Sequence, residues 1–368
     1  MTRSAAPTPR RRAKLAALGL ALLLSGCADA GLVVDASGAM LTTGRVDGSS
    51  AVAPNLPRRA GSPRHILVLT SGGADGAFGA GVITAWTASG RRPQFDIVSG
   101  TSTGALQATA AFLGPDYDAL LERIYTSTRT RDIFRSNGVK TLLGTGLYDP
   151  APLRRLLDEV IDETTLDAVA AAHAAGRRLY VTTTDMTAGR SVLWDMGAIA
   201  SGQGDRKSAF LGVLVASAAV PGLVEPVYVR DQEGKLAVHS DGGVKTPVPL
   251  EAFMLKARRA VATHVWVIAN GHVSRDAALR SEARHVLGLA RRGITQLIRQ
   301  LLYTSVQDAE AKARRAGARF HLVALPTSVP EAVDPLDFRP DELRGLYETG
   351  RATGQLRFGS VADEAAHQ

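Results

Sequence analysis

The sequence predicts an α/β fold with a central, mostly parallel sheet and helices on both faces. Short apolar runs rich in branched residues alternate along the chain with longer stretches of helical periodicity. This alternation is typical of helix-covered sheets. Hydrophobic residues make up 45% of the 368 residues and charged residues 21%, so a packed globular core is expected.

The elements follow one another in a regular order. A strand at 65–70 leads through a glycine-rich turn into a helix at about 76–89. A strand at 95–99 then leads into a helix at 103–113, which Gly114-Pro115 ends. The pattern further predicts helices at 116–127, 151–172, 208–219, 281–316 and 341–350, and strands at 178–184, 189–194, 227–230, 236–239, 264–268 and 320–323.

The first 26 residues have the pattern of a signal peptide. An apolar run of about ten residues, 15–24, is shorter than the roughly 20 that a membrane-spanning helix needs. It follows five basic residues in a stretch without acids: Arg3, Arg10, Arg11, Arg12 and Lys14. Without these five charges the formal charge of +8 falls to +3. The basic composition is therefore poor evidence for nucleic-acid binding, and we expect no nucleic-acid partner.

The end of this segment, Leu24-Ser25-Gly26-Cys27, resembles a bacterial lipobox. Cys27 is the single cysteine, which excludes an internal disulfide. We expect it to be lipidated and to anchor the chain in the cell envelope of a Gram-negative bacterium. Ala28 favours the outer membrane over the inner one. The alternative is an ordinary cleaved signal that contains a stray cysteine.

The remaining chain divides by composition. Residues 27–62 are rich in Gly, Ser, Pro and Ala without sustained periodicity, which predicts a flexible tether. The α/β pattern extends over 63–330, and 331–368 is expected to form a C-terminal helical segment and tail of no predicted function.

A candidate nucleophile lies between the second strand and its helix. In Gly100-Thr101-Ser102-Thr103-Gly104, a G-x-S-x-G motif turns from strand to helix and places the serine on the tip of the turn. Gly100 and Gly104 remove side chains that would clash there. The helix N-terminus favours negative charge that develops beside Ser102. A tight turn without chemistry remains the alternative.

A second glycine-rich turn, Ser71 to Gly79, also follows a strand and opens a helix. Bare N–H groups at Gly72, Gly73 and Ala74 could form an anion pocket. A phosphate loop is excluded because no Lys-Ser/Thr pair follows. A dinucleotide site is poorly supported because the turn lacks G-x-G-x-x-G. We expect no cofactor.

A nucleophilic serine also needs a base that accepts its proton. An α/β-hydrolase triad needs a histidine, but none lies in a glycine-flanked turn among His173, His239, His264, His272, His285, His321 and His367. Asp241 instead ends a strand and precedes two glycines, although a plain turn would give the same pattern. No metal is implied, because H-E-x-x-H and clustered Cys/His sets are absent from the sequence.

The order of the three motifs resembles the patatin-like phospholipases. They are G-G-x-x-G-x-x-G from Gly72, G-x-S-x-G around Ser102, and Asp-Gly-Gly from Asp241. Further resemblance lies in 147–153, 181–189 and 216–222, so it spans about 65 to 275. It implies a three-layer sandwich and a hydrolase of membrane lipids or other acyl esters. In that family Ser102 would be the nucleophile, Asp241 the base, and the amides of Gly72, Gly73 and Ala74 the oxyanion hole.

Two positions depart from the usual family pattern. Ser71 stands in place of the first of three glycines, and Asp75 stands where a basic residue is frequent. The second departure puts a preference for anionic substrates in doubt, but not the hydrolytic chemistry. Two other functions remain open: a Ser-His-Asp esterase, and a non-catalytic, lipid-anchored envelope protein that kept the fold for binding.

Overall fold

The computed structural model describes most of the chain. The described residues are 32–35, 40–42, 62–138, 144–230, 234–256, 262–274, 286–330, 334 and 336–359. The predicted signal peptide and Cys27 lie outside them. None of the helices within these ranges combines the length and apolarity that crossing a membrane requires.

Ten strands of the described chain form one sheet, and its centre is parallel as the sequence predicts. The parallel strands are, in spatial order, β13 (Arg319–Ala324), β12 (Thr263–Ala269), β3 (Arg64–Leu69), β4 (Ile97–Thr101) and β7 (Arg178–Asp185). Three strands joined by antiparallel pairing extend the sheet from β7: β8 (Arg190–Asp195), β10 (Val227–Arg230) and β11 (Leu236–Asp241). The mostly parallel α/β fold is therefore confirmed.

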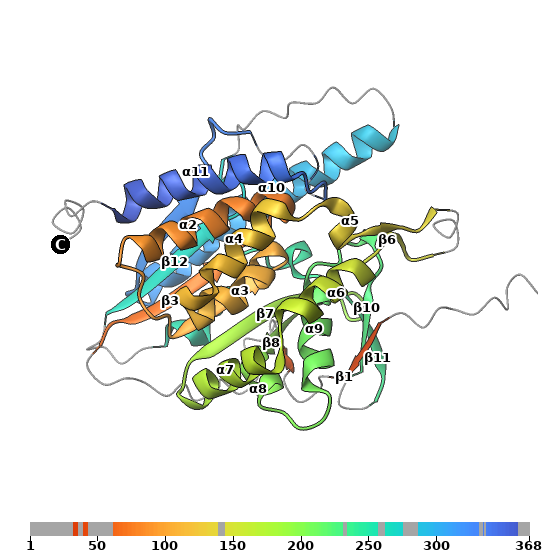
Figure 1. Cartoon of the computed structure of the whole chain (residues 1–368), viewed down its shortest axis with the longest axis horizontal. Coiled ribbons are helices and arrows are strands. Elements are labelled where there is room, and N and C mark those ends of the chain that lie inside the picture. The colour runs from red at the N-terminus through yellow and green to blue at the C-terminus, as the bar shows by residue number, and fades with distance from the viewer. Residues whose placement is uncertain are drawn as a thin grey trace, which may run out of the picture.

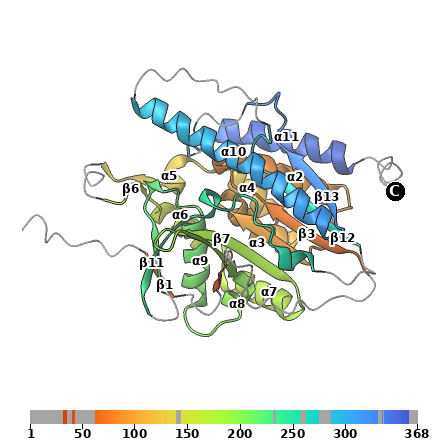
Figure 2. The ribbon, with the colours of Figure 1, turned by 180° about the vertical axis from the view of Figure 1, so that it is seen from behind.

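Helices cover both faces of this sheet (Figures 1 and 2). On one face lie α2 (Gly76–Ala88), α3 (Thr103–Leu113), α4 (Asp118–Ser127) and α11 (Pro340–Phe358); on the other lies α10 (Val286–Arg315). Alternate residues of β3 enter two separate cores: Leu67 and Leu69 pack with α2 and α3, while Ile66 and Val68 pack with α10. Successive side chains of a strand point to opposite faces of the sheet, so a strand buried on both faces carries one layer of helices on each side.

The helical pattern predicted as one element at 151–172 is two helices. They are α6 (Ala151–Val160) and α7 (Glu163–Ala174). The reason is local, because the Asp162 side chain accepts a hydrogen bond from the Thr165 N–H (2.8 Å) and caps a new helix.

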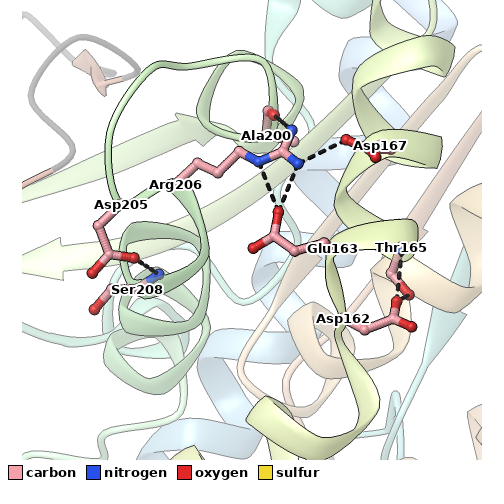
Figure 3. A network of polar contacts seen from close by, with 8 residues as sticks. All are labelled: Asp162, Glu163, Thr165, Asp167, Ala200, Asp205, Arg206 and Ser208. Atoms are coloured by element: carbon pink, nitrogen blue, oxygen red, sulfur yellow. Dashed lines mark hydrogen bonds and ion pairs between the residues drawn. The ribbon is translucent and has the colours of Figure 1, made fainter.

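A polar network ties α7 to α9 (Arg206–Ser217), as Figure 3 shows. Arg206 at the start of α9 donates to Glu163 (2.6 Å) and Asp167 (2.7 Å) of α7 and to the Ala200 carbonyl (3.0 Å). Asp205 caps α9 by accepting from the Ser208 N–H (2.9 Å). This network fixes the start of a helix whose other end supports the site described below.

Part of the expected tether is built into the sheet. β1 (Val33–Asp35) pairs in parallel with β10, and β2 (Met40–Thr42) pairs antiparallel with β8. The expectation of a free linker across 27–62 is therefore wrong for these six residues. An edge strand offers unpaired backbone groups to such a segment. Val34 is also buried against Gly212 of α9.

The folded unit continues past the expected boundary at 330. α11 packs on α2 along three glycines, since a Cβ on Gly81 would lie 2.0 Å from the Tyr347 carbonyl oxygen and one on Gly350 2.0 Å from that of Phe78. Gly354 similarly faces Ala85. Elements that the sequence did not predict are short: α5 (Thr130–Ile133), α8 (Met196–Ala200), and a small sheet of β5 (Arg135–Ser136), β6 (Gly146–Asp149) and β9 (Gly222–Val224).

Candidate active site

Ser102 lies on a strained turn between β4 and α3. Its backbone has φ 55° and ψ −125°, and among the described residues it is the one non-glycine with a positive φ. A Cβ on Gly100 would lie 2.4 Å from the Gly104 carbonyl oxygen, and one on Gly104 would lie 2.3 Å from that of Leu69. Both glycines are therefore required by close backbone approach. Such strain costs on the order of 1–3 kcal/mol and persists where the surroundings enforce it.

The surroundings of Ser102 include the end of α9. The Ser102 N–H donates to the Ser217 hydroxyl (3.0 Å), which in turn donates to the Thr182 carbonyl of β7 (2.7 Å). The Ser102 carbonyl accepts from the Ala105 N–H (2.9 Å) as α3 begins. Strand, turn and two helices thus fix the backbone that carries the hydroxyl.

The register of the sheet brings Asp241 to Ser102. Residues 180–185 of β7 pair with β8 along one edge. On the other edge β4 pairs up to Thr101 opposite Thr182, and β11 pairs from Asp241 opposite Thr183. The two strands therefore meet end to end along the same edge of β7. This meeting joins residues that lie 139 positions apart in the sequence.

The Asp241 carboxylate is buried and hydrogen-bonded. Its exposed fraction is 5%, and that of Ser102 is 7%. Oδ1 accepts from the Gly243 N–H (2.6 Å), and the Ser102 side chain is its other hydrogen-bond partner. Burial raises the pKa of Asp241 to about 6, although both hydrogen bonds act in the opposite direction. The carboxylate is therefore a stronger base than an exposed aspartate.

The glycine-rich turn after β3 lies beside this pair. Gly72 and Gly73 line the same cavity as Ser102, while Ala74 is buried behind them. A Cβ on Gly72 would lie 1.9 Å from the Asn270 carbonyl oxygen, and Gly73 has φ 58°. The flanking N–H groups are already used, since Ser71 donates to the Pro247 carbonyl and Asp75 to that of Gly72.

Asn270, which sequence reasoning missed, holds this turn in place. Its Nδ2 donates to the Thr70 carbonyl (2.8 Å) and to Gln107 of α3 (3.2 Å). Its N–H donates to the Thr70 hydroxyl (2.9 Å). Because Asn270 directly follows β12, this contact depends on the parallel pairing of β12 with β3. No local sequence pattern around Asn270 indicates this contact with the turn.

The cavity around Ser102, here called the Ser102 cavity, has a volume of about 140 Å³. Its lining is largely apolar, and Leu106, Ile133 and Phe338 belong to it. It also contains two buried groups of opposite charge, Asp75 and Arg299. The sequence identified Asp75 as an unusual acid at this turn. Arg299 lies almost 200 residues after Ser102, on α10, and no sequence motif around it indicates a role in the site.

His272 is the histidine that lines the Ser102 cavity. Its Nε2 lies 3.1 Å from the Pro326 carbonyl oxygen and 2.8 Å from that of Val329, so this nitrogen carries the proton. His239, two residues before Asp241, bonds to Thr183 through Nδ1, and burial lowers its pKa to about 4. His285 and His367 lie outside the described residues.

Metal ligation finds no support in the part of the chain that the structure describes. No group of three or more His, Cys, Asp or Glu side chains is arranged there to hold an ion.

A serine on a strained strand-to-helix turn, at the edge where parallel strands end, is the arrangement of α/β hydrolases that use a serine nucleophile. Residues 67–254 match the model of the patatin-like phospholipase family, and the chain belongs to that family. The matched region includes Ser102, Asp241 and the turn after β3.

Solved structures with a similar fold are distant in sequence. VipD from Legionella pneumophila is 13% identical, with a TM-score of 0.46, and the match covers 93% of this chain and 72% of VipD. ExoU from Pseudomonas aeruginosa, solved in complex with SpcU, is 14% identical with a TM-score of 0.33. That match covers 81% of this chain and 53% of the other. No curated protein matches this sequence.

Proposed function

We propose that this protein is a lipid acyl hydrolase that cleaves carboxylic esters with a Ser102–Asp241 dyad. The observation that carries the proposal is that Ser102 and a buried Asp241 line the same cavity, where the Ser102 side chain acts on a carboxylate whose pKa is raised to about 6. Family membership and the largely apolar lining of the Ser102 cavity support a lipid substrate such as a phospholipid or lysophospholipid.

In the first half-reaction Asp241 accepts the Ser102 proton as Oγ attacks the ester carbonyl. The oxyanion forms beside the amides of Gly72, Gly73 and Ala74, each such donor typically stabilising the transition state by ~2.7–4 kcal/mol. The C–O bond to the alcohol then breaks, and protonated Asp241 returns its proton to the leaving oxygen. An acyl-serine remains.

In the second half-reaction water replaces the alcohol. Asp241 removes a proton from the water as its oxygen attacks the acyl-serine carbonyl. The bond to Oγ breaks, Ser102 regains its proton, and the fatty acid leaves. A buried carboxylate serves both steps because its pKa lies closer to neutral pH than the ~3.9 of a free aspartate.

The triad alternative requires a histidine as base. His272 is the candidate that lines the Ser102 cavity, but its Nε2 is engaged by two backbone carbonyls. His239 is bonded to Thr183 and does not line the Ser102 cavity. Both contacts favour the dyad over the triad.

Three substitutions in the folded protein test this mechanism. Ser102→Ala is expected to abolish acyl-ester hydrolysis and labelling by a fluorophosphonate probe. Asp241→Asn should lower kcat by several orders of magnitude with little change in lipid binding, because the loss is confined to the transition state. His272→Ala should leave kcat within about tenfold, equivalent to ~1.4 kcal/mol of barrier.

The outcomes separate the three candidate functions. A folded His272→Ala protein as inactive as Asp241→Asn would establish a triad. Absence of probe labelling in the parent protein would favour the non-catalytic envelope protein. Near-normal hydrolysis by Ser102→Ala would remove the active site from this turn.

We also propose that lipidation of Cys27 anchors the protein in the envelope of a Gram-negative bacterium, on the outer membrane rather than the inner one because Ala28 follows the cysteine. The lipobox-like end of the N-terminal segment supports this. Cys27→Ser should release the protein into the periplasmic fraction or leave its signal uncleaved. Fractionation and gel mobility identical to the parent's would disprove lipidation.

A further inference from the structure

A second cavity adjoins the Ser102 cavity and takes no part in the mechanism above. This side cavity, of about 60 Å³, lies among α3, α4 and α6. Five residues line both cavities: Thr103, Leu106, Ile133, Leu153 and Phe338. Thr103 directly follows the proposed nucleophile, so the side cavity begins beside the reacting atom.

The lining of the side cavity suits a hydrocarbon. Leucine, isoleucine and valine side chains form most of it, and more than half of these lie on α4 and α6. Its hydroxyl groups are largely bonded within the protein: Tyr125 donates to the Thr103 carbonyl (2.9 Å) and Thr128 to the Ile124 carbonyl (2.6 Å). The buried Thr109 hydroxyl has no hydrogen-bond partner among the described residues. Apolar cavities of this kind stay dry and bind apolar groups.

The direction of the side cavity follows α3. Thr103, Leu106 and Ala110 line it from successive turns of that helix. With a rise of ~1.5 Å per residue, the wall from Thr103 to Ala110 extends about 10 Å from the nucleophile. The cavity is therefore elongated away from Ser102 and narrow.

We propose that the side cavity binds the acyl chain of the substrate and limits its length. The inference rests on the proposed function, because it assigns the acyl side of the ester to this cavity. The substrate class is then an ester of a single linear acyl chain, with the alcohol portion in the Ser102 cavity beside Arg299. Ala110 and Leu156, which line only the side cavity, determine the chain length.

Two substitutions of opposite effect test this assignment in the full chain. The measurement is the ratio of kcat/KM for p-nitrophenyl octanoate to that for the butyrate, because an octanoyl chain matches the length of the cavity wall. Ala110→Leu narrows the side cavity and should lower the ratio at least tenfold. Leu156→Ala enlarges the cavity and should raise the ratio several-fold. Ala171→Leu, the same change at an exposed position of α7, is the matched control and should leave the ratio unchanged.

A binding measurement separates this inference from the proposed chemistry. In the Ser102→Ala background, a fluorescent fatty acid should bind at least tenfold more weakly when Ala110→Leu is added, and equally well with Ala171→Leu. If the parent hydrolyses no ester but this binding pattern holds, the proposed function fails and the side cavity remains an acyl site. Unchanged ratios and unchanged binding in both cavity variants would overturn the inference. If Ala110→Leu does not fold, Leu156→Ala decides the question alone.

Discussion

Asp241 is placed where its burial and its hydrogen bonds act in opposite directions on its ionisation. Removal from water raises its pKa, while the Ser102 and Gly243 donors favour the charged form. The net result, a pKa of about 6, leaves the carboxylate ionised at neutral pH and still able to accept a proton. A solvent-exposed aspartate, with a pKa of ~3.9, would be a much weaker base.

This placement predicts the pH dependence of the reaction. Below the pKa the base is protonated, so kcat/KM should fall about tenfold per pH unit below pH 6 and level off above it. Initial rates on a soluble ester between pH 4 and 8 measure this fall in kcat/KM. A carboxylate ionises with little enthalpy, so the apparent pKa should hardly move with temperature. A pKa that falls steadily on warming would indicate a histidine instead.

At the scale of elements, the contact between α2 and α11 shows how the C-terminal helix joins the fold. Gly81 and Gly350 allow each helix backbone to touch the other, which side chains would prevent. α2 also begins at the glycine-rich turn of the site. α11 therefore supports the helix that begins beside the cavity, and the two helices lie side by side in Figure 1.

Two glycine substitutions in α11 should have opposite effects on stability. Gly350→Val places atoms where the Phe78 carbonyl lies and should destabilise the protein by about 1–3 kcal/mol or more. Gly345→Ala meets no atom within 4 Å and should stabilise the exposed helix by up to ~1 kcal/mol. Urea unfolding of both variants measures the difference. Equal midpoints would show that the close contact is not required.

At the scale of the whole molecule, global stability depends on histidines that fold in the neutral form. His239 is fully buried, and its pKa is lowered from 6.5 to about 4, chiefly by burial and further by Arg190, against an opposing effect of Asp185. The unfolded chain therefore binds a proton at a higher pH than the folded protein does. The contribution of His239 is complete above pH 6.5 and is lost as the pH falls from 6.5 towards 4.

Acidification should reveal this contribution in the free energy of unfolding. Between pH 7.5 and 4.5 the parent should lose up to about 3 kcal/mol more than His239→Gln, which keeps an acceptor for Thr183 but cannot be protonated. Urea titrations at several pH values provide the comparison. The hypothesis fails if the difference between the two proteins is the same at every pH.

The sequence by itself determined the parts that depend on local chemistry. Period-two and helical patterns located most strands and helices, and G-x-S-x-G predicted the strained turn at Ser102 because glycine alone tolerates its close backbone contacts. Asp241 was a candidate because two glycines follow it at a strand end, and the resemblance of the ordered motifs to the patatin-like family made it the expected base. The helix cap at Asp162 also depends on neighbouring residues, but we overlooked it because helical periodicity continues across it.

Only the tertiary structure decided what depends on pairing between distant segments. The end-to-end meeting of β4 and β11 on β7 brings Ser102 to Asp241, and the parallel pairing of β12 brings Asn270 to the turn at Gly72. Arg299 and the side cavity arise from helices packed from across the chain. β1 and β2 join the sheet because edge strands were open to them. Register and helix packing are sums of many weak, distant contacts, and no short stretch of sequence contains them.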